Sequence, residues 1–225
     1  MKKVLVILTL VCSLLFSACG KESTVAKSGG KPFTKNYETI SDAEAEKYFD
    51  EHYVDERKLP VLDFNLERRF VSGDRCLEFH DSVENPPEAV IYEYYRNCAE
   101  GDYETIKDMV LGENLKTVIK NDEKSFKEGR YLSYVRIEDV DLVDRDDFNK
   151  ISSNHKKMVI NLLEELNVSE FAIVEVEKTI KLSEKLLNSA PQIGDGEAER
   201  FYLLGLADGG YKICEIYWEG FIRDI

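Results

Sequence analysis

Cys19 is the residue of this sequence best placed for covalent chemistry. It follows the mostly apolar residues 4–16 and the small residues Ser17 and Ala18, and a polar stretch begins directly after it. A thiolate is a strong nucleophile, so a cysteine at such a junction can accept a lipid as a thioether. Two lysines precede the apolar run, which completes the three-part pattern of a secretory signal. The apolar run is too short to span a bilayer core of about 30 Å.

Residues 16–19, Phe-Ser-Ala-Cys, resemble the lipobox of bacterial lipoproteins, although phenylalanine stands where leucine is usual. In that family the cysteine sulfur receives a diacylglycerol and the cysteine becomes the new N-terminus. The resemblance implies a signal peptide over residues 1–18, lipid attachment at Cys19, and a lipid-anchored place on the extracytoplasmic face of the cell membrane. The alternative is an ordinary cleaved signal with an incidental cysteine.

The chain is acidic, with 44 acidic and 30 basic residues and a formal net charge of -14. Such a charge does not suit nucleic acid or direct contact with anionic lipid. We therefore expect no nucleic-acid partner and membrane contact through the lipid anchor alone. Residues 19–33 are rich in Gly, Ser and Lys, which is typical of a flexible tether.

Three cysteines lie in the body of the chain, at Cys76, Cys98 and Cys214. An odd number without a C-x-x-C pair argues against a disulfide framework and a zinc site. Cys98 and Cys214 fall in apolar patterns, where a small buried thiol is the ordinary interpretation. We expect all three to be unpaired.

The sequence shows no catalytic constellation. Asp102 follows a glycine and is expected to cap a helix, and Glu215 is expected to be an exposed or salt-bridged strand residue. The acidic run 138–147 lacks the spacing of an EF-hand loop. The three histidines stand far apart, without a second ligand at helical spacing. These patterns predict no enzyme activity, no metal and no cofactor.

Tyrosines are frequent in the segments that form the main domain. A tyrosine combines apolar bulk with a hydrogen-bonding tip, which suits a ligand cavity, a protein-binding face or a plain core. The residues expected to line a pocket, if one exists, are Tyr94, Tyr95, Tyr202, Tyr211 and Tyr217.

The elements that must position these residues begin with a helix over residues 42–53. Ser41 and Glu44 form a capping-box pattern at its start, and Pro60 prevents its continuation. A β-hairpin is expected next, with strands near residues 62–66 and 76–79. The region 34–84 is thus predicted to be a helix and hairpin extension.

A helix over residues 86–100 is predicted by the N-cap Asn85, the two prolines after it and the stop at Gly101. Two further helices, 102–111 and 113–127, are expected to follow. Four strands are then predicted near residues 130–143, 169–182, 199–207 and 211–218, the last two joined by an Asp-Gly-Gly turn. A long amphipathic helix, 148–167, is expected between the first two strands, with His155, Met158 and Val159 on its buried face.

Helices followed by a strand meander and this final hairpin resemble the nuclear transport factor 2-like superfamily. The residues that carry the resemblance include Tyr94, Tyr95 and the run 101–103 in the helices, and residues 210–213 in the last strand. The resemblance implies an α+β fold over residues 85–225, in which N-terminal helices pack into a curved antiparallel sheet to form a cone. The helix 148–167 departs from the simplest form of this family.

These observations together favour a membrane-anchored bacterial surface lipoprotein that acts as a non-catalytic binding module for a small molecule or a protein. Two alternatives stay open: a structural accessory subunit of an envelope complex, and an isomerase- or hydrolase-type enzyme with its site inside the cone. An enclosed pocket with an acid inside favours the enzyme, and a flat apolar patch favours the accessory role.

Overall fold

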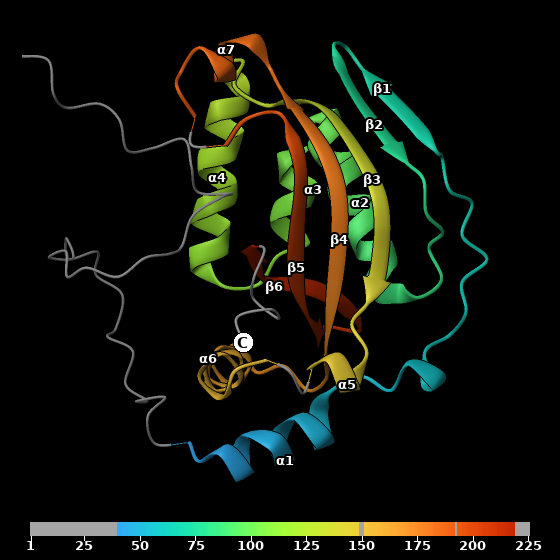
Figure 1. Cartoon of the computed structure of the whole chain (residues 1–225), viewed down its shortest axis with the longest axis vertical. Coiled ribbons are helices and arrows are strands. Elements are labelled where there is room, and N and C mark those ends of the chain that lie inside the picture. Colours follow the sequence, from blue (N-terminus) through green and yellow to red (C-terminus); the bar gives the residue numbers. More distant parts are fainter. Residues whose placement is uncertain (1–39, 149–150, 192, 219–225) are drawn as a thin grey trace, which may run out of the picture.

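The fold is built on one mixed, six-stranded sheet with helices on both faces, seen in a computed structural model that describes residues 40–148, 151–191 and 193–218 (Figure 1). The strands pair in chain order and are β1 (Arg69–Ser72), β2 (Arg75–Phe79), β3 (Leu132–Leu142), β4 (Phe171–Leu182), β5 (Gly196–Ala207) and β6 (Gly210–Trp218). The described helices are α1 (Asp42–His52), the short 3-10 helix η2 (Glu56–Lys58), α2 (Pro86–Glu100), α3 (Tyr103–Asp108), α4 (Glu113–Lys127), α5 (Arg145–Phe148), α6 (Ser153–Glu165) and α7 (Glu184–Leu187). The predicted α+β class is confirmed.

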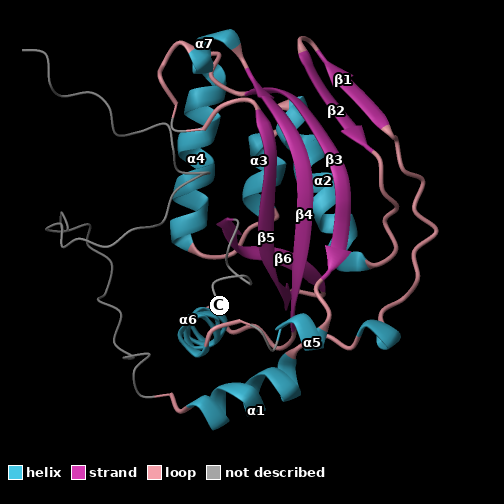
Figure 2. Cartoon of the chain, viewed as in Figure 1, coloured by secondary structure: helices cyan, strands magenta, loops and turns pink. Residues whose placement is uncertain are grey.

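The sheet curls around α2, which contacts β1, β2, β3, β4 and β6. Figure 2 shows α2 and α3 on one side of the strands, with β6 running across the ends of its neighbours. All strand pairs are antiparallel except β2 with β3, which run parallel. The four strands of the main domain, β3 to β6, are antiparallel as expected, and the parallel pair joins the N-terminal hairpin to them. Because three helices lie between β2 and β3 in the chain, the connection is long enough to return to the same edge and start a parallel strand.

The start and end of α2 follow from its sequence. The Asn85 side chain accepts from the backbone N–H of Glu88, and the Glu88 carboxylate in turn accepts from the Asn85 amide and the Glu84 N–H. Gly101 ends the helix at φ 85°, the left-handed region that favours glycine. A Cβ on Gly101 would lie 2.5 Å from the Phe126 ring, so glycine is also required for close packing against α4. The helix therefore enters the curl in a fixed register.

Two hydrophobic clusters lie on opposite faces of the sheet. The inner cluster joins α2, α3 and α4 to the concave face and includes Ile91, Ile137 and Val176. The outer cluster joins α1 and α6 to one end of the convex face. Its centre is Phe171, which is fully buried and packs edge-to-face on Phe49 with ring centroids 5.1 Å apart.

The N-terminal region contains the predicted helix and hairpin, with different strand bounds. The helix α1 has the expected capping box at Ser41 and Glu44. Residues 62–66, where a strand was expected, form no strand. The first strand is β1, which begins at Arg69, and the turn at Gly73 and Asp74 joins it to β2. Phe64 and Leu66 still pack against the inner cluster, which explains why apolar residues alternate there. The hairpin extends the sheet beside β3 rather than lying over one of its faces.

The helix predicted over residues 148–167 is shorter in the structure than expected, and a different side of it is buried. It forms as α6, with α5 before it, and its buried apolar residues are Val159, Ile160 and Leu163. Met158, expected on the buried face, is 48% exposed. The helix packs against α1 as well as the sheet, so its buried face is set by two contacts that lie far away in the sequence.

Candidate functional site

A cavity of about 130 Å³ lies between α2, α4 and the concave face of the sheet. Its walls are mostly apolar, and the apolar side chains include Leu132, Val135, Ile180, Leu182 and Ile216. Polar groups that are at least nine-tenths buried also line it, among them Asp122, Lys178, Arg200 and Tyr202. An apolar hollow with a few converging polar groups has the general character of a ligand site.

The structure brings three of the five expected tyrosines to this cavity. Tyr94, Tyr95 and Tyr202 line it, and all three are nearly inaccessible to solvent. Tyr211 does not line the cavity; its hydroxyl donates to Glu170 Oε1 at 2.5 Å. Tyr217 packs against the outer cluster on the opposite face of the sheet. The bulge in β6 between the partners of Leu203 and Leu204 changes the face on which the β6 side chains point, which explains why Tyr217 is not beside Tyr202.

Lys178 projects from β4 into the cavity. Its position is in phase with Val176 and Ile180, which face the inner cluster, and it is 8% exposed. The amine donates to the Tyr95 hydroxyl, which lies 2.5 Å from the Tyr202 hydroxyl. Burial, and then the nearby charge of Arg200, hold the pKa of Lys178 well below its usual range. Burial thus favours the neutral form of this amine.

Arg200 is the second basic group, and it projects from β5 onto the same concave face. Lys178 pairs with Ala198 across the strands, so Arg200, two residues further on, is its diagonal neighbour. Arg200 is 8% exposed and donates to the backbone oxygen of Glu199 at 2.5 Å. Among the described residues, no carboxylate lies within ion-pair distance of Lys178 or Arg200.

Asp122 faces the cavity from α4. It shares the buried side of that helix with Leu115 and Ile119. Its Oδ2 atom is buried and has no hydrogen-bond partner. Burial raises the pKa of the Asp122 carboxyl to about 8, so the group is mostly protonated at neutral pH. In that form it can donate a hydrogen bond as well as accept one.

Cys98, one of the two thiols beside the cavity, is not a nucleophile in this environment. Cys76 and Cys98 both line the cavity, and Cys76, Cys98 and Cys214 are free, as expected. Burial raises the pKa of Cys98 to about 12, and the Asp122 carboxyl adds to this rise. A thiol with such a pKa is neutral, so Cys98 contributes apolar surface rather than a nucleophile.

The sequence interpretation missed Asp122, Lys178 and Arg200. Each is a charged residue that stands in phase with apolar neighbours: Lys178 with Val176 and Ile180, and Asp122 with Ile119 at helical spacing. A charged residue on the apolar side of a strand or helix was therefore the signal available. That pattern alone does not tell a buried group from one at the exposed end of an element.

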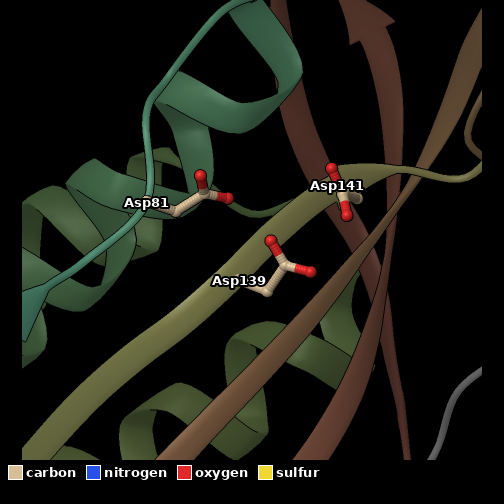
Figure 3. A group of neighbouring side chains, drawn as sticks. All are labelled: Asp81, Asp139 and Asp141. Atoms are coloured by element: carbon tan, nitrogen blue, oxygen red, sulfur yellow. The ribbon is translucent and has the colours of Figure 1, made fainter.

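A second group of acids lies outside the cavity, where Asp81, Asp139 and Asp141 point toward one another (Figure 3). Their oxygens lie within 4.8 Å of one another, a spacing that an oxygen-coordinated cation can bridge. The Asp81 carboxylate, however, already accepts from the backbone N–H groups of Ser82 and Val140 at 2.7 and 2.9 Å. Burial and the neighbouring acids raise the pKa of Asp139 to about 7. A shared proton therefore accounts for the closeness of these acids. Through its hydrogen bond from Val140, Asp81 connects the loop after β2 to β3.

Cys19, the signal peptide 1–18 and the tether 19–33 lie outside the described residues. Within residues 40–148, 151–191 and 193–218, none of the helices combines the length and apolar character needed to cross a membrane. The structure thus bears on the cavity and not on the site of lipid attachment.

No family model, no curated protein and no solved structure matches this chain.

Proposed function

We propose that this chain is a lipid-anchored protein of the bacterial cell surface whose folded part binds a small molecule without altering it. The observation that carries the proposal is the cavity, in which two buried polar atoms without hydrogen-bond partners, Asp122 Oδ2 and Arg130 Nε, stand among apolar walls. A buried polar group that lacks a hydrogen-bond partner costs about 1–3 kcal/mol. A fold that keeps two such atoms around one hollow is best explained by a ligand that satisfies them.

The size of the cavity limits the ligand. An engineered cavity of about 150 Å³ in another protein holds benzene, and this cavity measures about 130 Å³. The ligand proposed here is accordingly about as large as one ring or a short branched chain. Half-buried side chains at Arg130, Tyr131, Leu186 and Ile193 border the cavity and give it room to adjust.

Two further features support the proposal. The lipobox-like residues before Cys19 support attachment to the membrane, because they follow a signal-like apolar run. The position of α2 inside the curled sheet supports a likeness to the nuclear transport factor 2-like cone, in which a ligand sits between helix and sheet. The parallel pairing of β2 with β3 adds the N-terminal hairpin, which lies outside the resemblance, to the edge of that sheet.

Ligand binding is tested by thermal unfolding of the full-length protein in detergent with a library of small aromatic and branched aliphatic compounds. At least one compound is expected to raise the unfolding temperature. Ala99→Leu places a larger side chain at the cavity wall and should abolish the shift, whereas Glu100→Leu, at the exposed next position, should preserve it. If no compound shifts the wild type, or if both variants respond as the wild type does, the cavity is not the binding site.

Membrane attachment is tested with Cys19→Ala and the control Cys12→Ala, which changes the other cysteine near the N-terminus. Cys19→Ala should move the protein from the detergent-rich phase to the aqueous phase, because one acyl chain or none gives weak membrane binding. Cys12→Ala should partition as the wild type does. Equal partition of the Cys19 variant and the wild type would refute the lipid anchor.

One observation favours a second candidate, an enzyme. Asp122 lies inside the cavity with its pKa raised to about 8, and general acids in active sites often show such a rise. Mass spectrometry of a bound compound after long incubation separates the two candidates. Recovery of the compound unchanged supports a binding module. Conversion that is lost in Asp122→Asn supports the enzyme.

A further inference from the structure

The groups around Lys178 carry hydrogen-bond donors that the contacts among them leave unused. A neutral amine has two N–H groups, and the hydroxyls of Tyr95 and Tyr202 add one O–H each. Only two contacts link the three groups, one between Lys178 and Tyr95 and one between Tyr95 and Tyr202. Whichever atoms donate, about half of these hydrogens have no acceptor within the trio.

Arg200 adds further donors beside them. Its guanidinium has five N–H groups and is charged at all accessible pH values. The backbone oxygen of Glu199 accepts from one of its nitrogens. Because Arg200 lowers the pKa of Lys178 through its charge, the two basic groups are close enough to repel. Two neighbouring basic side chains, each 8% exposed, are retained in a chain of net charge -14.

The acid in the cavity does not neutralise these groups. Burial alone accounts for the raised pKa of Asp122, and neither Lys178 nor Arg200 lowers it. Asp122 therefore faces the cavity mostly as a neutral acid, on the α4 side, and presents a donor of its own. The polar groups of the cavity thus share one property, which is an excess of donors and of positive charge.

We infer that the cavity binds a small organic anion, a carboxylate on an apolar body, with its carboxylate held by Arg200, Lys178 and the hydroxyls of Tyr95 and Tyr202. The inference rests on the proposed function and names the class of its ligand. A carboxylate supplies two acceptor oxygens and the missing negative charge, and a guanidinium matches its planar shape. The apolar walls, which include Val135, Ile180 and Ile216, take the body of the ligand.

Binding of an anion should also change the protonation of Lys178. The ionisable groups that face this amine are Tyr95 and Cys98 on α2, Arg200 and Tyr202 on β5, and Asp122 on α4. Asp122 is mostly protonated at neutral pH and the other groups are not anions, so among the described residues the arriving carboxylate supplies the main negative charge near the amine. The complex is therefore expected to take up a proton from solution as the neutral amine becomes an ammonium.

The test is isothermal titration calorimetry of the full-length protein in detergent, with benzoate and its neutral analogue benzamide as probes. The two probes have nearly the same size, so a difference between them reports the charge. At pH 7 benzoate should bind at least about tenfold more tightly than benzamide. Titrations in two buffers of different ionisation enthalpy should show uptake of up to about one proton per benzoate and none per benzamide.

Lys178→Met should weaken benzoate at least about tenfold and abolish proton uptake, with little effect on benzamide. Lys181→Met is the matched control, because Lys181 is exposed on the same strand and lies over the Tyr134 ring. It should bind both probes as the wild type does. If Lys178→Met does not fold, the comparison of the two probes and the proton uptake of the wild type still test whether the cavity binds an anion.

Equal affinities for the two probes, or benzoate binding without proton uptake, would refute the inference that the ligand is an anion. Either result would leave a small-molecule site in place. Benzoate binding that Lys181→Met weakens as much as Lys178→Met does would place the anion on the surface, which also refutes the inference. Failure of both probes together with a negative thermal screen would remove the proposed function itself.

Discussion

Two buried lysines of this protein meet opposite surroundings. Lys156 on α6 is 4% exposed, and its ammonium reaches the Glu46 carboxylate at 2.5 Å. Lys178 on β4 is 8% exposed and meets a tyrosine hydroxyl, a cavity and a neighbouring arginine. The first lysine joins two helices, and its charge is paired. The second has no such structural partner, so burial of a basic group without a counter-charge, rather than burial alone, marks the candidate site.

The same contrast separates the two faces of the sheet. The convex end is filled by aromatic packing around Phe171, with Phe49 and Tyr53 edge-to-face on it. The concave face keeps a hollow beside Tyr95 and Tyr202. A closely packed face stabilises the fold through the contacts of its side chains. A face with a cavity lacks some of these contacts, so the cavity itself does not stabilise the fold.

The largest expected effect tests this contrast of faces. Phe171→Ala should lower the free energy of unfolding by about 3–5 kcal/mol, because it removes a fully buried ring from the solid cluster. Tyr95→Ala should cost less than half as much, because Tyr95 already borders empty space. Urea denaturation of the two variants measures both values. Equal losses would show that the concave side is as tightly packed as the convex side.

The next effect contrasts the two lysines. Lys178→Met should raise the free energy of unfolding of the ligand-free protein by about 1–3 kcal/mol, because it removes a buried polar group. The gain should be largest at low pH. The pKa of Lys178 is depressed in the folded state. At a pH below the pKa of an ordinary lysine, unfolding is therefore accompanied by uptake of a proton, and the wild type loses stability as the pH falls.

Lys156→Met should change stability little by comparison, because it removes a paired charge and leaves Glu46 with 52% of its side chain exposed to water. Chemical denaturation of both variants at pH 6 and pH 9 provides the measurement. A loss of stability in Lys178→Met would mean that the amine has a structural role like that of Lys156.

A pH effect that builds up over several pH units is expected from Asp122→Asn. The pKa of Asp122 is about 8 in the folded protein and near 4 in the unfolded chain, so the folded state holds the extra proton between these values. This contribution to stability is present below about pH 4 and is lost as pH rises to about 8.

Asparagine does not titrate, so the stability of Asp122→Asn relative to the wild type should rise over that range, by up to about 1.4 kcal/mol per pH unit. A flat difference for Asp122→Asn would place its carboxyl in contact with water.

The smallest effect concerns the rate of thiol alkylation. Cys98 and Cys214 have pKa values raised to about 12 by burial, so both should react slowly with a soluble reagent at pH 8, compared with the unfolded protein. A compound that fills the cavity should slow Cys98 further and leave Cys214, on the outer cluster, unchanged. Rapid alkylation of Cys98 in the folded protein would show that the cavity opens readily.

Local sequence patterns determined the bounds of α2 and α4. The cap at Asn85 and the stop at Gly101 set α2, and α4 has the predicted bounds from Glu113 to Lys127. The hairpin of β5 and β6 and the α+β class also follow from the sequence. These features depend on contacts between residues close in the chain, such as a side chain that caps the N–H three residues later, and such contacts can be recognised from spacing.

Only the tertiary structure decided how the sheet is assembled and what lies inside it. The parallel pairing of β2 with β3 joins segments separated by three helices, and the buried side of α6 depends on α1. The meeting of Lys178, Arg200 and Asp122 at one cavity requires two strands and a distant helix to enclose the same space. The alternation of β4 was an available signal that Lys178 faces inward, which the sequence interpretation missed, and only the curl of the sheet around α2 determines whether the inward side is filled or hollow.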